Sequence, residues 1–203
     1  MIERYTFGER LVHWISGFSY LYALATGLAL YEPHLYWIAV VLGGGPTIRY
    51  WHPWIALLFV ATVVAMLEMW RPDMKITAID REWGRKMRHY IRNEDELVPP
   101  AGRFNLGQKY FFWIMLWSAF VLLLSGLVLW FPERIPWNLR GFRYAAVLLH
   151  EASALVTIGM FIIHVYMGTA MVRGSFTAMV RGHVTTGWAK THHRLWYQRM
   201  TGR

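Results

Sequence analysis

The sequence predicts an all-α membrane protein built as a bundle of four transmembrane helices. Of its 203 residues, 56% are hydrophobic and only 16% are charged, a composition too apolar for an ordinary soluble domain. Four long runs contain no Asp, Glu, Lys or Arg, and each approaches the roughly 20 residues that a spanning helix needs. These runs, residues 11–31, 50–67, 110–132 and 152–172, predict spans at about 11–31, 52–70, 110–131 and 144–172 of one membrane domain, 1–203.

The distribution of basic residues predicts the orientation of the chain. Seventeen of the 21 Lys and Arg residues lie before the first run, between the second and third runs, or after the fourth run. The positive-inside rule therefore makes both termini, the loop 71–109 and the tail 173–203 cytoplasmic. The net charge of +9 is then explained by topology and by contact with anionic lipid, so no nucleic-acid binding is expected.

The first span follows a short polar segment without a cleavable signal pattern, so we expect an uncleaved anchor. Gly17 and Gly27 make one face of this span small, which favours either close helix packing or a bulky ligand. The uncharged stretch 33–48 is short and interrupted by the sequence GGGP, so it is interpreted as an interfacial excursion. An aromatic belt is expected at the outer surface, formed by Tyr36, Trp37, Tyr50, Trp51 and Trp54.

The central loop and the tail are the polar parts of the chain. Residues 81–96 are predicted to form a short amphipathic helix on the membrane surface, broken afterwards by Pro99 and Pro100. The third span then begins after the polar motif NLGQK at residues 105–109, and a short outer loop leads into the fourth. The basic, Trp-rich and His-rich tail is typical of a docking or surface segment. No internal repeat is apparent.

Four of the nine histidines are placed at depths where a membrane site could use them. His150 and His164 are fourteen residues apart, so on a helix they share nearly the same face and lie roughly 21 Å apart along the axis. One therefore lies near each membrane surface, and ionisable groups in spanning helices usually mark functional sites. His52, at the outer start of the second span, is level with His150, and His13, at the cytoplasmic start of the first, is level with His164.

Two imidazole pairs at two depths, His52 with His150 and His13 with His164, are what two stacked b-type haems require. The chain has no cysteine, which excludes thiolate ligands and covalent c-type haem within it. The alternative is that each histidine only sits at an interface or bonds a neighbouring helix. Zinc is less favoured, since Glu151 is the only extra ligand nearby.

Other polar residues have weaker assignments. Arg10 and Arg49 lie at suitable levels to contact haem propionates. The remaining histidines fall in loops or the tail and are expected to have surface or docking roles: His34, His89, His183, His192 and His193.

The motif NLGQK lies at the cytoplasmic entry of the third span, level with His164. An amide side chain, an exposed glycine N–H and the edge of a ligand histidine could hold the carbonyl oxygens of a quinone and relay its protons. The alternative is a helix cap, because asparagine and glycine are common just before a helix begins.

Together these residues resemble the cytochrome b556 gamma subunits of membrane-bound respiratory formate dehydrogenases of types N and O. The resemblance covers nearly the whole chain, and its motifs are RLVHW around His13, RYWHPW around His52, FNLGQK at 104–109, LLHEA and IIHVYM around His150 and His164, and GSFTAMVRGHVTTGWAKTHHRLWY in the tail.

The resemblance implies two haem b groups held by the same two histidine pairs, as iron ligands. It also implies a menaquinone or ubiquinone site near the inner haem at Asn105, Gly107 and His164, with Gln108 and Lys109 in the same motif. Leu106, between Asn105 and Gly107, departs from the expected pattern of polar contacts.

The implied partners are an iron–sulfur beta subunit and a molybdenum or tungsten alpha subunit facing the periplasm, arranged as a trimer of heterotrimers in the bacterial inner membrane. Electrons from formate oxidation would cross the membrane and reduce quinone at the cytoplasmic face. The alternative is a cytochrome b subunit of a periplasmic nickel–iron hydrogenase or another molybdoenzyme. A transporter or channel is disfavoured, because the spans carry almost no deep charge.

Overall fold

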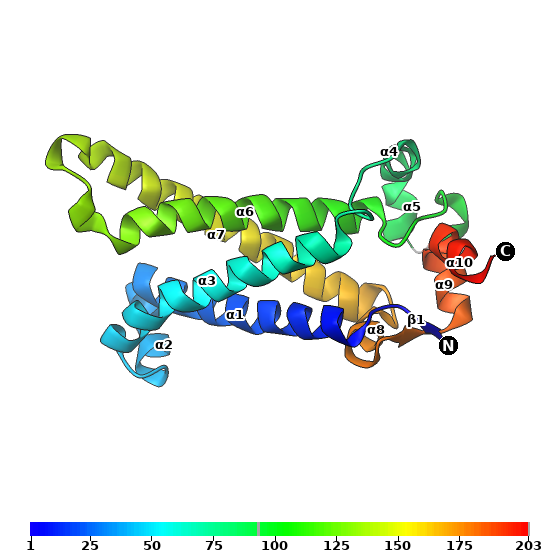
Figure 1. The fold of residues 1–203 in the computed structure, drawn as a ribbon, viewed down its shortest axis with the longest axis horizontal. Coiled ribbons are helices and arrows are strands. Elements are labelled where there is room, and N and C mark those ends of the chain that lie inside the picture. Colours follow the sequence, from blue (N-terminus) through cyan, green and yellow to red (C-terminus); the bar gives the residue numbers. More distant parts are fainter. Residues whose placement is uncertain (93, 203) are drawn as a thin grey trace. The chain divides into compact units, whose positions relative to one another are not determined.

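The computed structural model describes residues 1–92 and 94–202 and is almost entirely helical. The chain divides into two compact units. The first consists of Met1–Arg10, Leu67–Met115 and Met160–Arg203, and the second consists of Leu11–Met66 and Leu116–Gly159. Four long helices supply most of both units, namely α1 (Phe7–Tyr31), α3 (Gly45–Trp70), α6 (Leu106–Trp130) and α7 (Arg140–Tyr166) (Figure 1).

Three stretches of the described chain are long and apolar enough to cross a membrane: Gly45–Trp70, Leu106–Trp130 and Trp137–Met171. The helix α1 has 25 residues, about 37 Å at 1.5 Å per residue, and its membrane crossing stays a prediction. Each long helix begins four to seven residues before its predicted span. The fourth ends its α-helical part at Tyr166 and continues as a π-helical turn, η5 (Met167–Met171).

In the second unit, α1 and α3 are joined by two short helices, η1 (Pro33–Leu35) and α2 (Tyr36–Val41). The break predicted at GGGP occurs here. Gly43 and Gly44 have φ values of 96° and 93°, a conformation that glycine adopts without steric cost. Ala29, Ala39 and Ile48 form the small core under this connection. The connection from α6 to α7 contains η3 (Pro132–Arg134) and η4 (Trp137–Leu139).

The first unit contains the short elements of the loop and tail. The loop forms α4 (Ala78–Arg85), α5 (Met87–Ile91) and η2 (Asp95–Leu97), and the tail forms α8 (Ser175–Arg181), α9 (Thr186–His192) and α10 (Arg194–Thr201). Two antiparallel strands, β1 (Ile2–Glu3) and β2 (His183–Val184), pair Ile2 with Val184. This ladder ties the N-terminal segment to the tail.

The amphipathic helix predicted over residues 81–96 is wrong in its extent. It is replaced by α4 and α5, which are separated at Lys86, a residue with φ −104° and ψ 10°. Tertiary packing explains the break: a Cβ on Gly84 would lie 2.6 Å from Cδ2 of Leu106, so α4 is fixed tightly against the start of α6. The capping box at Thr77 and Asp80 fixes its other end.

Two buried carboxylates of the first unit, Glu9 and Asp80, are each paired with a cation. Arg103 contacts Glu9 at 2.6 Å, and Glu9 also accepts from the indole N–H of Trp70 at 2.7 Å. Lys109 contacts Asp80 at 2.7 Å, with both side chains buried. Such pairs satisfy buried groups without adding much net stability, but removing one partner from a buried pair costs about 3–5 kcal/mol.

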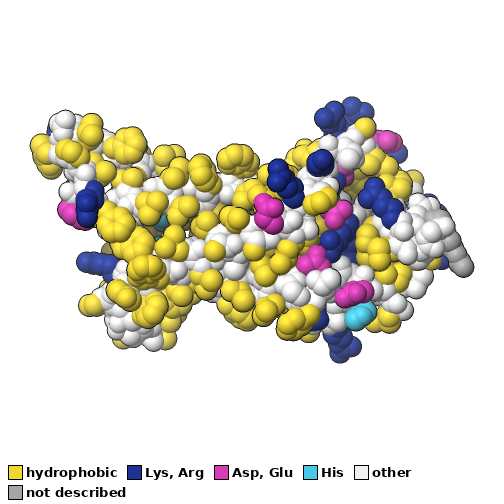
Figure 2. Space-filling view, viewed as in Figure 1, with side chains coloured by type: hydrophobic (Ala, Val, Ile, Leu, Met, Phe, Trp, Pro, Cys, Tyr) yellow, Lys and Arg dark blue, Asp and Glu magenta, His cyan; other side chains and the backbone are white. Residues whose placement is uncertain are grey.

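Hydrophobic and charged side chains lie on different parts of the surface. On the face shown in Figure 2, hydrophobic side chains cover the long helices, and Lys, Arg, Asp and Glu gather over the short helices of the first unit. Large hydrophobic residues with high exposure occur along every long helix, such as Phe18, Trp117 and Leu155 at 65%, 61% and 68%. Exposed apolar side chains of this kind suit a lipid environment.

Candidate functional site

Two of the four predicted histidine ligands face each other in the second unit. His52 on α3 and His150 on α7 have ring centroids 6.4 Å apart, with ring planes inclined at 60°. A metal–nitrogen bond of about 2.0 Å, plus about 1.1 Å from nitrogen to ring centre, would place the centroids of two imidazoles on one ion roughly 6 Å apart. The observed spacing therefore fits one metal ion held between the two rings.

Each imidazole lies directly against a glycine of a neighbouring helix. A Cβ on Gly27 of α1 would lie 3.3 Å from Cε1 of His52, and a Cβ on Gly126 of α6 would lie 3.2 Å from Cε1 of His150. Both distances are tighter than ordinary van der Waals contact. The small face predicted for the first span thus accommodates an imidazole at Gly27, and the same device recurs on α6.

Hydroxyl groups next to these glycines contact the ring nitrogens. Oγ1 of Thr26 lies 2.9 Å from Nδ1 of His52, and Oγ of Ser125 lies 2.9 Å from Nδ1 of His150. Thr26 is completely buried and Ser125 is 5% exposed. Neither hydroxyl was predicted from the sequence, although each directly precedes a glycine that lies against a ring.

This donor set fits haem b. Non-covalent haem needs two axial imidazoles, small residues beside it and an apolar environment, and its ligand histidines usually donate their second ring nitrogen to a nearby acceptor. His52 and His150 supply the imidazoles, and Thr26 and Ser125 supply the second contacts. Nε2 of neither ring is hydrogen-bonded to a residue that the structure describes, so both remain available as ligands.

The other predicted pair is divided between the units, so each histidine is described by itself. His13, on α1 in the second unit, meets the ring of Trp14 edge-on at 5.6 Å. His164, on α7 in the first unit, stacks on Phe111 of α6 at 4.5 Å with an interplanar angle of 14°. Their shared role as ligands stays a prediction.

The polar groups of the NLGQK motif are largely used to cap α6. The amide oxygen of Asn105 accepts from the backbone N–H of Gln108, and the amide oxygen of Gln108 accepts from the backbone N–H of Asn105, both at 3.0 Å. This reciprocal pair is a capping box, and the helix-cap alternative is thereby confirmed. Two donors of the motif are left for a quinone, Nδ2 of Asn105 and the backbone N–H of Gly107. The N–H of Gly107 lies in the first turn of α6, where backbone N–H groups have no acceptor within the helix.

The surroundings of Asn105 are aromatic and buried. Its Nδ2 lies 3.5 Å from the hydroxyl of Tyr90, and Tyr90 packs against Trp83 with ring centroids 5.0 Å apart. Burial, together with the charge of Asp95, raises the pKa of Tyr90 to about 12. The phenol is therefore protonated at neutral pH and keeps an O–H donor next to Asn105. Lys109 of the same motif is held by Asp80 and by the carbonyl of Lys75.

Two expectations about individual residues need correction or qualification. His193 was expected at the surface, but it is 2% exposed, and its ring contacts the carbonyl of Gly102 at 2.8 Å and the guanidinium of Arg4 at 3.3 Å. That expectation is wrong, because the tail folds back onto the loop and the N-terminal segment. Arg10 donates to the carbonyl of Val180 at 2.6 Å, so this part of its guanidinium is already used.

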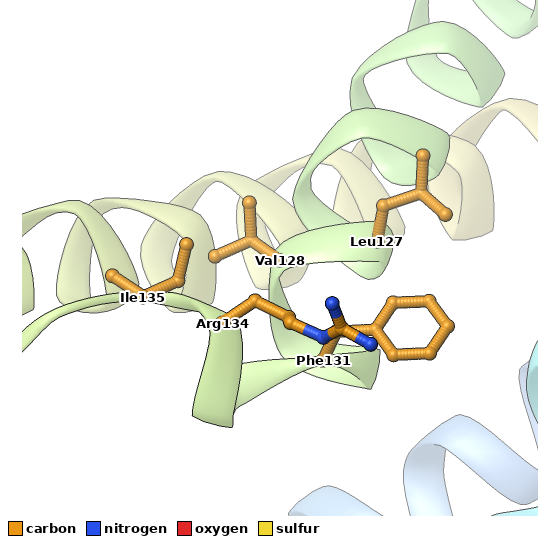
Figure 3. Close-up of a pocket in the computed structure, with 5 residues that line it drawn as sticks. All are labelled: Leu127, Val128, Phe131, Arg134 and Ile135. Atoms are coloured by element: carbon orange, nitrogen blue, oxygen red, sulfur yellow. The ribbon is translucent and has the colours of Figure 1, made fainter.

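A pocket of about 460 Å³ lies at the end of α6 (Figure 3). Five side chains line it: Leu127, Val128, Phe131, Arg134 and Ile135 (Figure 3). The lining is apolar with one cation and contains no histidine, so it is separate from the paired-imidazole site.

Comparison with known proteins finds one matching family and several similar proteins. A family described as prokaryotic cytochrome b561 matches residues 4–182. The formate dehydrogenase cytochrome b556(fdo) subunit of Escherichia coli K12 is 34% identical over 97% of this chain and 92% of its own length. The formate dehydrogenase cytochrome b556 subunit of Haemophilus influenzae is 30% identical over 97% of this chain and 82% of its own length. The nitrate-inducible cytochrome b556(Fdn) subunit of E. coli K12 is 30% identical, with 98% and 91% covered.

Proposed function

Because the chain belongs to the prokaryotic cytochrome b561 family, we propose that it is the di-haem b subunit of a membrane-bound formate dehydrogenase. In this role it carries electrons from formate oxidation on the outer side of the bacterial inner membrane to quinone on the cytoplasmic side. The observation that carries the proposal is the facing pair His52 and His150, at 6.4 Å between ring centroids and backed by Gly27 and Gly126.

In the proposed outer site, Nε2 of His52 and Nε2 of His150 would hold the haem iron. The haem b iron, when bound, supplies reversible one-electron oxidation and reduction. The protein residues hold the two imidazoles at a fixed separation, and the apolar helices around them exclude water. Burial matters because it controls solvent access and the potential of the bound group.

The second proposed ligand pair is His13 and His164. Support for this pair comes from the sequence, where both histidines fall at the same depth on the cytoplasmic side, and from the resemblance to the cytochrome b556 subunits. Four spanning helices, with both termini, the loop 71–109 and the tail 173–203 in the cytoplasm, complete this topology. Arg49 and Arg10 remain candidates for propionate contacts.

The proposed quinone site uses Nδ2 of Asn105, the N–H of Gly107 and His164, with the protonated hydroxyl of Tyr90 beside Asn105. These groups donate hydrogen bonds to quinone carbonyl oxygens, and the imidazole of His164 and the phenol of Tyr90 relay protons that come from the cytoplasmic side. Gln108 acts mainly through the cap, because its amide oxygen holds the N–H of Asn105. Reduction of quinone at this face consumes cytoplasmic protons, which contributes to a protonmotive force without a proton channel.

The proposed partners are an iron–sulfur beta subunit and a molybdenum- or tungsten-containing alpha subunit on the periplasmic side, in a trimer of heterotrimers. Support comes from the names of the relatives, which are subunits of formate dehydrogenases. The basic loop and tail would contact anionic lipid on the cytoplasmic surface. A nickel–iron hydrogenase or another molybdoenzyme as electron donor is the alternative within the same cytochrome family.

The function is tested with membranes that contain the full chain and its partner subunits. Formate alone should reduce b-type haem absorbance, and a quinone-site inhibitor should block its reoxidation. Replacement of His164 with Ala should remove one b-haem, retain the other and abolish formate-driven quinone reduction. Reduction by hydrogen but not by formate would assign the chain to the alternative complex, and an unchanged two-haem spectrum in H164A would contradict the ligand assignment.

A further inference from the structure

The two sides of the His52 and His150 pair are built from a repeated segment. Residues 23–31 (ALATGLALY) and 122–130 (LLLSGLVLW) match at an offset of 99, with Leu, hydroxyl, Gly, Leu, Leu and aromatic positions aligned. The absence of an internal repeat stated in the sequence analysis is therefore wrong for these nine residues. The repeat is short. The hydroxyl residue and the glycine at its centre can be recognised as equivalent only because each copy contacts a histidine ring in the structure.

The geometry of the two copies agrees closely. Thr26 and Ser125 each place an oxygen 2.9 Å from Nδ1 of a histidine, and the following glycines approach Cε1 of the same rings with virtual Cβ distances of 3.3 and 3.2 Å. Each contact joins two helices within the second unit, α1 to α3 and α6 to α7. The pair is thus made of two equivalent half-sites.

The direction of the hydroxyl–imidazole hydrogen bonds follows from the other contacts of the hydroxyls. Oγ1 of Thr26 lies 2.7 Å from the carbonyl oxygen of Tyr22, and Oγ of Ser125 lies 2.6 Å from the carbonyl oxygen of Val121. A carbonyl cannot donate, so each hydroxyl gives its single hydrogen to its own helix. Each hydroxyl must then accept from Nδ1–H of the histidine.

This assignment fixes the ring tautomer. A neutral imidazole carries one N–H, and when Nδ1 holds it, Nε2 presents a lone pair for a metal. Each ring also has a backbone acceptor near it, the carbonyl of Ala23 for His52 and the carbonyl of Leu122 for His150. These carbonyls precede Thr26 and Ser125 by three residues, so the second acceptor is repeated as well.

We propose that Thr26 and Ser125 are positioning residues that lock His52 and His150 as Nδ1–H tautomers with Nε2 free to ligate, and that their hydrogen bonds lower the reduction potential of the haem between them. This inference rests on the proposed function, since it assumes a haem at that pair. An acceptor on Nδ1–H makes the imidazole a stronger electron donor through Nε2, which favours the oxidised iron.

The test is a redox titration of the b-haem absorbance in membranes that contain the full chain and its partner subunits. Thr26→Val and Ser125→Ala should each shift the midpoint potential of one haem upward while the other haem is unchanged. The double variant should shift the same haem further, because each substitution acts on a different axial ligand. Thr62→Val and Ser19→Ala are matched controls, since these hydroxyls donate to the carbonyls of Phe59 and Ile15 in the same unit. The controls should leave both potentials unchanged.

Conservative variants cover the case in which the hydroxyl deletions lose haem. Thr26→Ser and Ser125→Thr keep a hydroxyl and should restore both haem content and potential; failure to restore them would overturn the inference in favour of a packing role. Unchanged potentials in T26V and S125A would also overturn it. The proposed function fails differently: His52→Ala and His150→Ala would then leave both haems in place.

Discussion

The two units differ in what their buried polar side chains contact. In the first unit, Glu9 pairs with Arg103, and Asp80 pairs with Lys109. In the second unit, Thr26 and Ser125 contact the Nδ1 atoms of histidines whose Nε2 atoms have no hydrogen bond to the described residues. Buried polar groups are normally satisfied inside a protein. Burial of polar groups therefore does not by itself identify a ligand site in this protein. The site is identified by ring nitrogens that have a fixed orientation and no hydrogen bond to the part of the chain that the structure describes, namely Nε2 of His52 and Nε2 of His150.

The largest expected effect tests the structural character of the first unit. Lys109→Met leaves the carboxylate of Asp80 buried without its cation, so the free energy of unfolding should fall by about 3–5 kcal/mol. Denaturation of the purified chain in detergent, followed by tryptophan fluorescence, measures this loss. The paired variant Lys109→Met with Asp80→Leu should recover most of it. Equal stability of the single variant and wild type would show that the pair is not buried as described.

The close approach of Gly126 to His150 offers a test within the second unit. Gly126→Val adds a side chain where a Cβ already lies 3.2 Å from Cε1 of His150, and overpacking of this kind costs about 1–3 kcal/mol. The ring should be displaced, and haem content per chain should fall. Gly141→Val is the control, because a Cβ at Gly141 has no neighbour within 4 Å. Equal haem content in both variants would argue against a site beside Gly126.

Two substitutions of Asn105 distinguish its role as a helix cap from its proposed role in binding quinone. Asn105→Ala removes the oxygen that accepts from the N–H of Gln108 and should lower stability by about 0.5–2 kcal/mol. Asn105→Ser keeps a capping oxygen but has no amide donor. This variant should keep wild-type thermal stability and raise the KM for quinone. A wild-type KM in N105S would assign Asn105 to the cap alone.

The pH dependence of stability should be concentrated in the first unit. Burial, and then the charge of Arg4, lowers the pKa of His193 well below its ordinary value. Because the unfolded chain takes up this proton first, the stabilising contribution is complete above about pH 6.5 and declines as the pH falls below it. Unfolding temperatures recorded from pH 7.5 to 5 should fall in the wild type and fall less steeply in His193→Gln.

Much of the fold could be predicted from the sequence because uncharged runs and membrane thickness constrain helices strongly. The predicted spans that contain His52 and His150 indeed form long helices, and Gly43 and Gly44 follow the end of α2, between α1 and α3. The division of the 81–96 segment could not be predicted, since it depends on the contact of Gly84 with Leu106. Local amphipathic patterns do not reveal such tertiary packing.

The candidate site shows a similar limit. Depth in the membrane was enough to pair His52 with His150, and the structure brings their rings together. The hydroxyls of Thr26 and Ser125 were missed, because a single Thr or Ser in an apolar helix is commonly bonded to its own backbone. The repeated hydroxyl–glycine pair was a detectable pattern. The burial of His193 was missed because its partners, Gly102 and Arg4, are far away in the sequence.

The most direct measurement of the central claim is a set of redox difference spectra for His52→Ala, His150→Ala and the double variant, in membranes that contain the full chain and its partner subunits. If the two imidazoles ligate one haem, each single variant should lose the same b-haem, the double variant should lose nothing more, and the remaining haem should keep its potential. Loss of different haems in the two single variants, or retention of both haems in either one, would contradict the account.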